Sequence, residues 1–227
     1  MRLIRKREII NRINLAFYNS KSFSQYGEDK IVYEMLGIYN LRLSTYMDIG
    51  ANHPFLLNNT ALFYGMGYSG INIEPDPLLY SRFIKERKRD INLNVGVHKK
   101  KGKLKYYQFE RSEFNTFSED SARKTELCGI KKINEVEVPV DTYNSIVEEY
   151  LNSKPPEILF LDAEGLDEEI IKSIDFSRYA PIILCVETFA FGGGLKNYKL
   201  IDFLLNNNYK IHADTYVNTI FILKSFS

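Results

Sequence analysis

The sequence predicts an α/β fold in which a mostly parallel central sheet is covered by helices on both faces. Short apolar runs alternate with segments of helical spacing along most of the chain, and connections of this length join parallel strands by right-handed crossovers. The 227 residues are 44% hydrophobic, which is enough for one large core. We therefore expect a basic N-terminal extension, residues 1–21, and a single domain, residues 22–227, with an insertion at about residues 98–140.

Local patterns predict the individual elements. Strands are expected where apolar runs are short, at residues 46–49, 70–73, 92–97, 158–161, 182–186, 209–213 and 219–223. Helices are expected where apolar residues recur every three to four positions, at residues 28–37, 59–65, 77–88, 142–151, 167–174 and 197–206. In the insertion, residues 103–109 and 136–140 alternate with period two and predict a hairpin. The polar stretch 112–132 between them predicts an irregular, mobile flap.

Composition excludes several classes of protein. The 30 Lys and Arg residues nearly cancel the 29 Asp and Glu residues, so no overall positive field favours nucleic acid. Two cysteines are too few for a disulfide framework. No apolar run reaches the roughly 18 residues needed to span a bilayer, and no secretory pattern follows the first basic residues. We expect a cytoplasmic protein.

Residues 1–20 interleave basic and apolar side chains, which is typical of a basic amphipathic helix. Such a helix would lie on an anionic surface at the inner face of a membrane or on a partner protein. Alternatively, it packs on the domain itself. The sequence leaves these alternatives open, as it leaves open whether the chain forms a homo-oligomer.

The most informative positions are Gly50 and Glu74, which each end an apolar run and lie 24 residues apart. In nucleotide-binding βαβ units, a glycine turn and an acid that binds the ribose are about 20 residues apart. Glycine lets the backbone turn tightly against a ligand, and a carboxylate offers two acceptor oxygens to a ribose diol. This pair predicts a cofactor that contains adenosine.

The residues around the turn indicate which adenosine cofactor is bound. After Gly50 the chain reads Ala-Asn-His-Pro-Phe, without the later glycines of the G-x-G-x-x-G fingerprint that binds a pyrophosphate. Asp48 precedes the turn, and an acid there favours a cationic ligand. S-adenosylmethionine carries a sulfonium and an ammonium group. We therefore predict that S-adenosylmethionine is bound by Asp48, Gly50, Ala51, Asn52, Glu74 and Pro75.

Several blocks of the chain together resemble the FkbM-type methyltransferase family. The matching stretches are Ser24–Asp29, Met47–Pro54, Asn58–Thr60 with Tyr64, Gly67–Pro75, Leu161–Gly165 and Val186–Glu187. They run from about residue 22 to residue 190, so the resemblance covers most of the chain. It departs from the family at Tyr68, where tryptophan is frequent, and at residues 166–168, where a His-Glu pair is frequent. Both departures bear on the acceptor pocket rather than on the cofactor.

The resemblance implies a Rossmann-like class I methyltransferase that transfers a methyl group from S-adenosylmethionine to a hydroxyl group. In this family the acceptor is often a sugar of surface polysaccharide or natural-product pathways, so a carbohydrate or a nucleotide- or lipid-linked sugar precursor is expected. The resemblance also implies that the Ser24–Asp29 block folds over the cofactor, with Gln25 or Glu28 touching its polar groups. Asn58 and Asn59 are expected either to bind the acceptor or to begin a helix.

Removal of the proton from a sugar hydroxyl calls for a base or a metal ion, because the hydroxyl has a very high pKa. His53 follows the cofactor turn, and Asp162 and Glu164 follow the predicted strand 158–161, so these three are the predicted catalytic residues. Glu187 is expected in the acceptor site. Asp162 and Glu187, with His53, would also suit Mg²⁺ or Mn²⁺. The spacing matches no fixed metal motif, and acids bonded to backbone amides are the alternative.

Two surface features bear on the acceptor. Phe189 and Phe191, before the glycine run 192–194, are expected at the rim of the acceptor site, where an aromatic face could stack on a sugar ring. Packing of a flexible loop is the alternative. The lysines between Lys99 and Lys105 either form a solvated face or attract a phosphate-bearing acceptor.

Two other functions remain open from the sequence alone. A nicotinamide-dependent sugar oxidoreductase would also bind an adenosine cofactor, although the missing glycines argue against it. A non-catalytic module of the same fold would bind the cofactor without turnover. Acids expected at the carboxyl ends of four strands favour an enzyme, namely Asp48, Glu74, Asp162 and Glu187.

Overall fold

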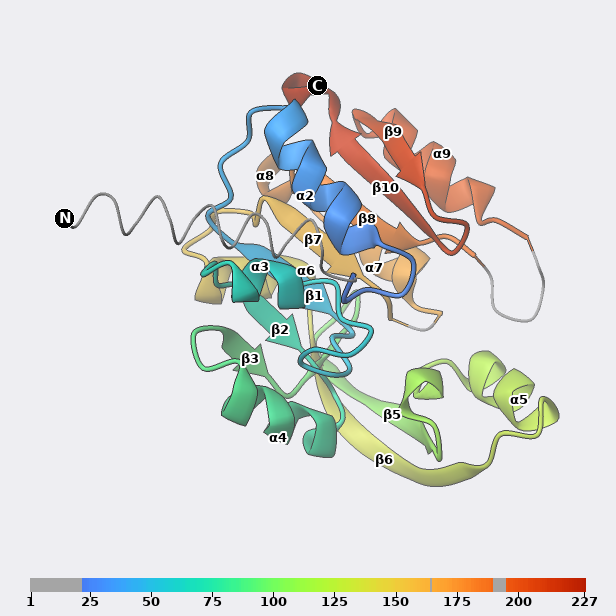
Figure 1. The fold of residues 1–227 in the computed structure, drawn as a ribbon. Coiled ribbons are helices and arrows are strands. Elements are labelled where there is room, and N and C mark those ends of the chain that lie inside the picture. The colour runs from blue at the N-terminus through green and yellow to red at the C-terminus, as the bar shows by residue number, and fades with distance from the viewer. Residues whose placement is uncertain (1–21, 164, 190–194) are drawn as a thin grey trace.

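A seven-stranded sheet lies at the centre of the computed structural model, which describes residues 22–163, 165–189 and 195–227 (Figure 1). In the order in which they pair, its strands are β3 (Ile91–Leu93), β2 (Ile71–Ile73), β1 (Tyr46–Ile49), β7 (Ile158–Leu161), β8 (Ile183–Glu187), β10 (Asn218–Leu223) and β9 (Tyr209–Asp214). The first five run parallel, and β10 is antiparallel to both of its neighbours. The predicted basic helix at residues 1–20 lies outside the described residues.

Helices cover both faces of this sheet, as predicted. One face carries α2 (Glu28–Ile38) and α3 (Ala61–Gly65), and the other carries α6 (Tyr143–Tyr150), α7 (Asp167–Ser173) and α9 (Tyr198–Asn206). Because side chains alternate along a strand, Tyr46 of β1 packs with α2 and α3, while Met47 packs with α6, α7 and α9. The core is thus two apolar layers with the sheet between them.

Two further helices extend the central fold. α4 (Pro77–Glu86) follows β2, and the short α8 (Phe176–Tyr179), which the sequence did not predict, precedes β8. A 3₁₀ turn, Lys224–Phe226, ends the chain. None of the helices in the described ranges is long and apolar enough to cross a bilayer.

The insertion forms a second, three-stranded sheet. Its strands pair in the order β4 (Gly96–Val97), β6 (Lys132–Asp141) and β5 (Gly102–Phe109). The predicted strand at 92–97 is divided, because Asn94 donates from its side-chain amide to the carbonyl oxygens of Glu74 (2.9 Å) and Pro75 (3.0 Å). Figure 1 shows the β5–β6 hairpin extending away from the central sheet.

The predicted flap is more ordered than its sequence indicates. It contains a 3₁₀ turn, η1 (Ser112–Phe114), and the helix α5 (Glu119–Leu127). Ser118 caps α5 by accepting a hydrogen bond from the backbone N–H of Ser121 (3.2 Å). The prediction of an irregular segment was wrong because α5 is polar nearly all round and buries only Ala122 and Thr125.

Candidate active site

A cavity of about 390 Å³ opens at the carboxyl edge of the central sheet. The strand order reverses here between β1 and β7, and such a switch point is where open α/β sheets bind ligands. Three residues directly follow the last paired positions of β2, β1 and β7, and a fourth is the last residue of β8, one position beyond the pair Leu161–Val186. These residues, Glu74, Gly50, Asp162 and Glu187, therefore form a row across the floor of the cavity.

The cavity brings together most of the residues predicted from the sequence. Its lining includes Gln25, Asp48, Gly50, Ala51, Asn52, Asn58, Asn59, Glu74, Pro75, Asp162 and Glu187. Glu28 and His53 are not part of the lining, and Glu164 lies outside the described residues. The row of three acids around Gly50 agrees with the predicted convergence at strand ends, whereas Asp48 lies inside β1.

The backbone at position 50 requires a glycine whether or not a ligand is bound. Its φ of +79° lies in the left-handed region, which side chains with a Cβ rarely adopt. A Cβ at this position would lie 1.9 Å from the carbonyl oxygen of Asp162. The turn after β1 thus passes against the end of β7, which brings both strand ends to the cavity.

Glu74 is the most constrained acid in the cavity. Only 3% of it is exposed, and each of its oxygens accepts one backbone hydrogen bond, from Asn52 (2.8 Å) and from Asp76 (2.7 Å). Burial raises the pKa of Glu74 to about 8, although these two hydrogen bonds act in the opposite direction. Each oxygen keeps a second lone pair, so the carboxylate is held in one orientation and can still accept from a ligand.

Asp48 is buried beneath the turn. Its Oδ2 accepts hydrogen bonds from the side chains of Asn58 (3.2 Å) and Thr60 (3.0 Å). Burial raises the pKa of Asp48 to about 6, while the hydrogen bond from Thr60 and the charge of Arg87 lower it. Asp48 lines the cavity from inside the strand, so it can place negative charge next to a bound cation.

Asn58 holds the cofactor turn in place. It is 1% exposed, and its amide N–H groups donate to Asp48 and to the carbonyl oxygen of Ala51 (3.0 Å). Its Oδ1 accepts from Thr60 and from Arg87. These contacts favour a supporting role over the predicted direct contact with the acceptor. The helix α3 begins three residues later, at Ala61, with Thr60 as its N-cap.

Arg87 completes this buried network, and the sequence did not reveal it. The residue is fully buried, and its Nε forms an ion pair with Asp90 at 2.8 Å. Its other nitrogens donate to the carbonyl oxygen of Pro54, to Asn58, and to the hydroxyl groups of Tyr46 and Thr60. The sequence places Arg87 in the predicted helix 77–88 and does not indicate its burial, because its partners other than Asp90 are distant in sequence.

Glu28 has a different place from the one predicted. It is fully buried, and its oxygens accept hydrogen bonds from Tyr26, Thr215 (2.7 Å) and Asn218 (2.9 Å). Burial would raise the pKa of Glu28, but these hydrogen bonds outweigh burial and lower it. Glu28 therefore ties the start of α2 to the turn between β9 and β10, while its neighbour Gln25 reaches the cavity.

His53 also lies outside the cavity lining. Its Nδ1 accepts the backbone N–H groups of Phe55 (3.2 Å) and Leu56 (3.1 Å), so the ring shapes the loop after the cofactor turn. Burial and the charge of Arg82 lower the pKa of His53, which keeps the imidazole neutral at pH 7. These contacts favour a local structural role for His53 over the predicted catalytic one.

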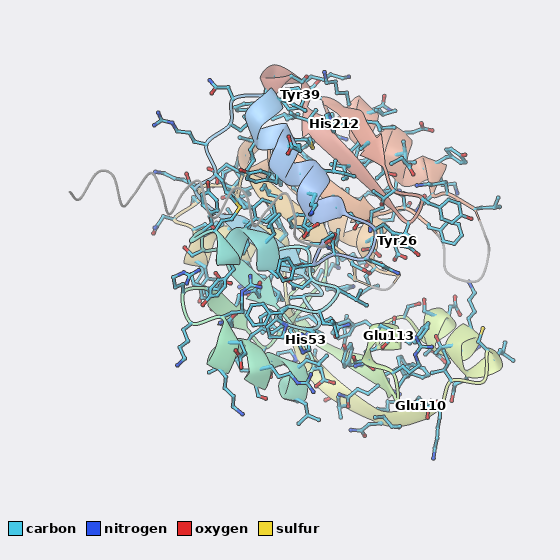
Figure 2. All side chains as sticks on the ribbon, in the orientation of Figure 1. Tyr26, Tyr39, His53, Glu110, Glu113 and His212 are labelled. Carbon is cyan, nitrogen blue, oxygen red and sulfur yellow. The ribbon has the colours of Figure 1, made fainter. Side chains whose placement is uncertain are left out.

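The insertion forms the opposite wall of the cavity, which the sequence did not predict in detail. Its lining residues are Tyr106, Arg111, Ser112, Glu113, Phe114, Asn115, Thr116 and Phe117. Asp76 joins this wall to the cofactor turn, since its Oδ2 accepts from Gln108 (2.6 Å) and Asn115 (3.3 Å). Figure 2 shows Glu113 on the insertion and Tyr26 next to Gln25 in the chain, and the cavity lies between these two segments.

One known protein family matches a stretch of the chain that contains most residues of this cavity. A family model for the methyltransferase FkbM domain matches residues 48–211, which is most of the chain. The chain belongs to the FkbM methyltransferase family. This confirms the resemblance inferred from the motifs. No curated protein matches the chain at a significant level.

Solved structures of methyltransferases are similar to this FkbM methyltransferase at low sequence identity. A protein assigned as a caffeoyl-CoA O-methyltransferase from Staphylococcus aureus has 8% identity and a TM-score of 0.50, over 95% of this chain and 91% of that one. A TehB-like methyltransferase from Corynebacterium glutamicum has 10% identity and a TM-score of 0.46, over 99% and 100%. The first likeness and the sheet order confirm the predicted Rossmann-like class I methyltransferase fold.

The predicted metal site finds no support in this FkbM methyltransferase. Within the parts of the chain that the structure describes, no group of three or more His, Cys, Asp or Glu side chains is arranged to hold a metal ion. Asp162 and Glu187 lie in the same row, but His53 is committed to its own loop.

The lysine cluster on the insertion is largely neutralised. Lys99 pairs with Glu169 (2.5 Å), Lys101 with Asp141 (3.1 Å) and Lys105 with Glu135 (2.9 Å). Exposed pairs of this kind contribute little to stability, but they reduce the positive field available to a phosphate. The contacts favour the predicted solvated face over attraction of a phosphate-bearing acceptor.

Proposed function

We propose that the chain is an S-adenosylmethionine-dependent O-methyltransferase that acts on a hydroxyl group of a carbohydrate. Membership of the FkbM family supports methyl transfer. The observation that best supports this cofactor is the buried Glu74 beside the Gly50 turn. Backbone N–H groups orient both of its carboxylate oxygens. This arrangement suits the two hydroxyls of a ribose.

The residues of the cavity fit S-adenosylmethionine. The volume of about 390 Å³ lies within the roughly 300–1,000 Å³ that is usual for small-molecule sites. The carboxylates of Asp48, Asp162 and Glu187 would stabilise the positive charges of the cofactor. The pyrophosphate of a nicotinamide cofactor is an anion, so the same carboxylates would repel it. This disfavours a nicotinamide cofactor.

When bound, S-adenosylmethionine supplies an electrophilic methyl group, so the chain's own task is placement and proton removal. Glu74 would hold the ribose end, and Asp48 the cationic part. Asp162 and Glu187 stand next to each other at the ends of β7 and β8, half-buried and open to the cavity. One of these two carboxylates would accept the proton of the acceptor hydroxyl as its oxygen bonds to the methyl carbon.

The polar and aromatic lining beyond the row of acids supports a carbohydrate acceptor. Gln25, Asn59 and Glu187 present amide and carboxylate groups that hydrogen-bond sugar hydroxyls. Phe189 adds an aromatic face to the same cavity.

A transfer assay with labelled S-adenosylmethionine tests this function. The acceptors are free monosaccharides, nucleotide sugars and oligosaccharides, each with and without Mg²⁺ or Mn²⁺. We expect label in a sugar, and we expect Asp162→Asn and Glu187→Gln to reduce kcat while the Kd for S-adenosylhomocysteine changes little. Tight binding of the cofactor without transfer to any acceptor would instead indicate a non-catalytic module. Label in the nucleotide part of a nucleotide sugar, with none in any sugar, would contradict the carbohydrate assignment.

A further inference from the structure

Two aromatic rings stand together at the edge of the cavity. Phe189 is part of the cavity lining, and the ring of Tyr216 packs against it with centroids 4.9 Å apart and planes tilted by 35°. Tyr216 is 65% exposed, so most of its surface is open to solvent beside the cavity. An aromatic side chain of this size is usually more buried.

The conformation of Tyr216 is unfavourable for a tyrosine and is held by its neighbours. Its φ is +76°, in the left-handed region where bulky side chains are rare. The backbone N–H of Tyr216 donates to Oδ1 of Asp214 (2.8 Å), and Lys196 donates to both oxygens of Asp214 (2.8 and 2.7 Å). A glycine or asparagine would meet the needs of this turn more easily, so the turn alone does not explain the ring.

The backbone next to Tyr216 attaches the ring pair to the reacting end of the sheet. The carbonyl oxygen of Val217 accepts the backbone N–H groups of Thr188 (3.0 Å) and Phe189 (3.1 Å), which directly follow Glu187. Val217, Phe189 and Glu187 all line the cavity. The two rings are therefore attached to the segment that directly follows Glu187, and Phe189 shares the cavity with the Glu187 side chain.

We propose that Phe189 and Tyr216 form a platform on which the pyranose ring of the acceptor stacks, while Glu187 accepts hydrogen bonds from its hydroxyls. The C–H groups on one face of a sugar carry partial positive charge and pack well on the negative face of an aromatic ring. Sugar hydroxyls at the ring edge need polar partners at the same time, and the carboxylate beside the platform supplies them. This inference rests on the proposed function and names the residues that bind its acceptor.

Tyr216→Trp tests the platform by direct observation. The chain contains no tryptophan, so residue 216 becomes the only indole in the protein. The probes are methyl β-D-glucopyranoside, methyl β-D-galactopyranoside, methyl α-L-rhamnopyranoside and UDP-glucose, added to protein saturated with S-adenosylhomocysteine. We expect at least one to change the emission of Tyr216→Trp saturably. Phe226→Trp is the matched control, because the C-terminus lies at the opposite end of the molecule from the insertion (Figure 1), and its emission should stay constant.

Kinetics with the best sugar acceptor of the panel separate the platform from a purely structural turn. Tyr216→Gly keeps a residue that tolerates positive φ but removes the ring. We expect its KM for the sugar to rise at least about tenfold, with kcat within about threefold, with the Kd for S-adenosylhomocysteine unchanged and with a melting temperature no lower than that of the wild type. Tyr216→Phe should restore most of the affinity. Tyr198→Gly removes another exposed tyrosine and should leave the KM for the sugar unaltered.

The outcomes distinguish this inference from the proposed function. If sugars are methylated but Tyr216→Gly keeps the wild-type KM, the platform is refuted and the methyltransferase function stands. If sugars change the emission of Tyr216→Trp but none is methylated, the platform stands and the proposed reaction fails. If no sugar is methylated and none changes the emission, both are refuted.

Discussion

At the scale of single residues, Glu74 shows what sequence spacing can and cannot predict. Its distance from Gly50 predicts a ribose-binding acid, and the structure brings this acid to the cavity floor. The sequence does not predict the two backbone donors, from Asn52 and Asp76, because they depend on the conformation of two turns. These donors make the carboxylate rigid, so it needs little reorganisation to bind a ligand.

Substitution of Glu74 tests its role. Glutamine has one carbonyl oxygen and one amide group, so in Glu74→Gln a donor faces the backbone N–H of either Asn52 or Asp76. The same substitution replaces one acceptor of the ribose hydroxyls by a donor, and a ribose hydroxyl that loses its acceptor in the complex costs about 1–3 kcal/mol, which predicts a roughly 5- to 150-fold weaker Kd for S-adenosylhomocysteine. Calorimetric titration measures this change, with the exposed Glu86→Gln as control. An unaltered Kd in Glu74→Gln would remove the residue from the site.

Arg87 shows the opposite case, in which the structure assigns a role that the sequence hides. Its neighbours Lys88 and Arg89 are exposed, so the local pattern indicates a solvated charge run. Asp90 is close in sequence, but burial of Arg87 also depends on Asn58 and other partners that only the fold brings together. Long-range polar networks of this kind leave no periodic signal in one sequence.

We expect Arg87→Met to unfold the protein more easily. Removal of one partner from a buried ion pair leaves Asp90 uncompensated and costs about 3–5 kcal/mol. The free energy of unfolding in urea measures the loss. The control is Arg82→Met, an exposed arginine of the preceding helix, which should stay within about 0.5 kcal/mol of wild type. Equal stabilities of the two variants would show that the network contributes little.

At the scale of elements, prediction succeeds where a pattern is local. β1 and β7 are found at their predicted bounds, because short apolar runs followed by turns leave few alternatives. The hairpin β5–β6 was also predicted from its period-two alternation, which the structure confirms. α5 was missed because it is stabilised by the Ser118 cap and by a small contact with the insertion rather than by an apolar stripe.

One contact between the insertion and the central fold passes through Asp76, whose Oδ1 also caps α4. Serine is a good N-cap but cannot reach both Gln108 and Asn115. We therefore expect Asp76→Ser to increase amide hydrogen exchange in residues 96–141, while exchange in α4 and β1 stays close to wild type. Hydrogen-exchange mass spectrometry measures both. Unchanged exchange in the insertion would show that this contact does not hold the wall of the cavity.

At the scale of the whole molecule, stability and cofactor binding are linked through pH. A carboxyl whose pKa is raised on folding stabilises the protein below its unfolded pKa, and this stability is lost as pH rises through the folded value. The stability that protonated Glu74 contributes is lost as pH rises through its pKa of about 8. The contribution of Asp48 is lost as pH rises through its pKa of about 6. The cofactor's hydroxyls and positive charge favour the ionised carboxylates, so binding is strengthened over the same range.

The melting temperature of the free protein should therefore fall as the pH rises from 6 to 8.5. Over the same range, the rise in melting temperature caused by a fixed concentration of S-adenosylhomocysteine should become larger. Differential scanning calorimetry at several pH values measures both quantities. Glu74→Gln removes the group with the higher pKa and should flatten the dependence above pH 7. If S-adenosylhomocysteine raised the melting temperature of the wild type by the same amount at every pH, the linkage would be contradicted.

The central claim is that a carboxylate-lined cavity at the switch point of the sheet binds a cationic methyl donor. Isothermal titration of the wild-type protein with S-adenosylhomocysteine and, separately, with NAD⁺ tests it most directly. We predict micromolar or tighter binding of S-adenosylhomocysteine and no measurable heat from NAD⁺. Tight binding of NAD⁺ with no response to S-adenosylhomocysteine would contradict the account.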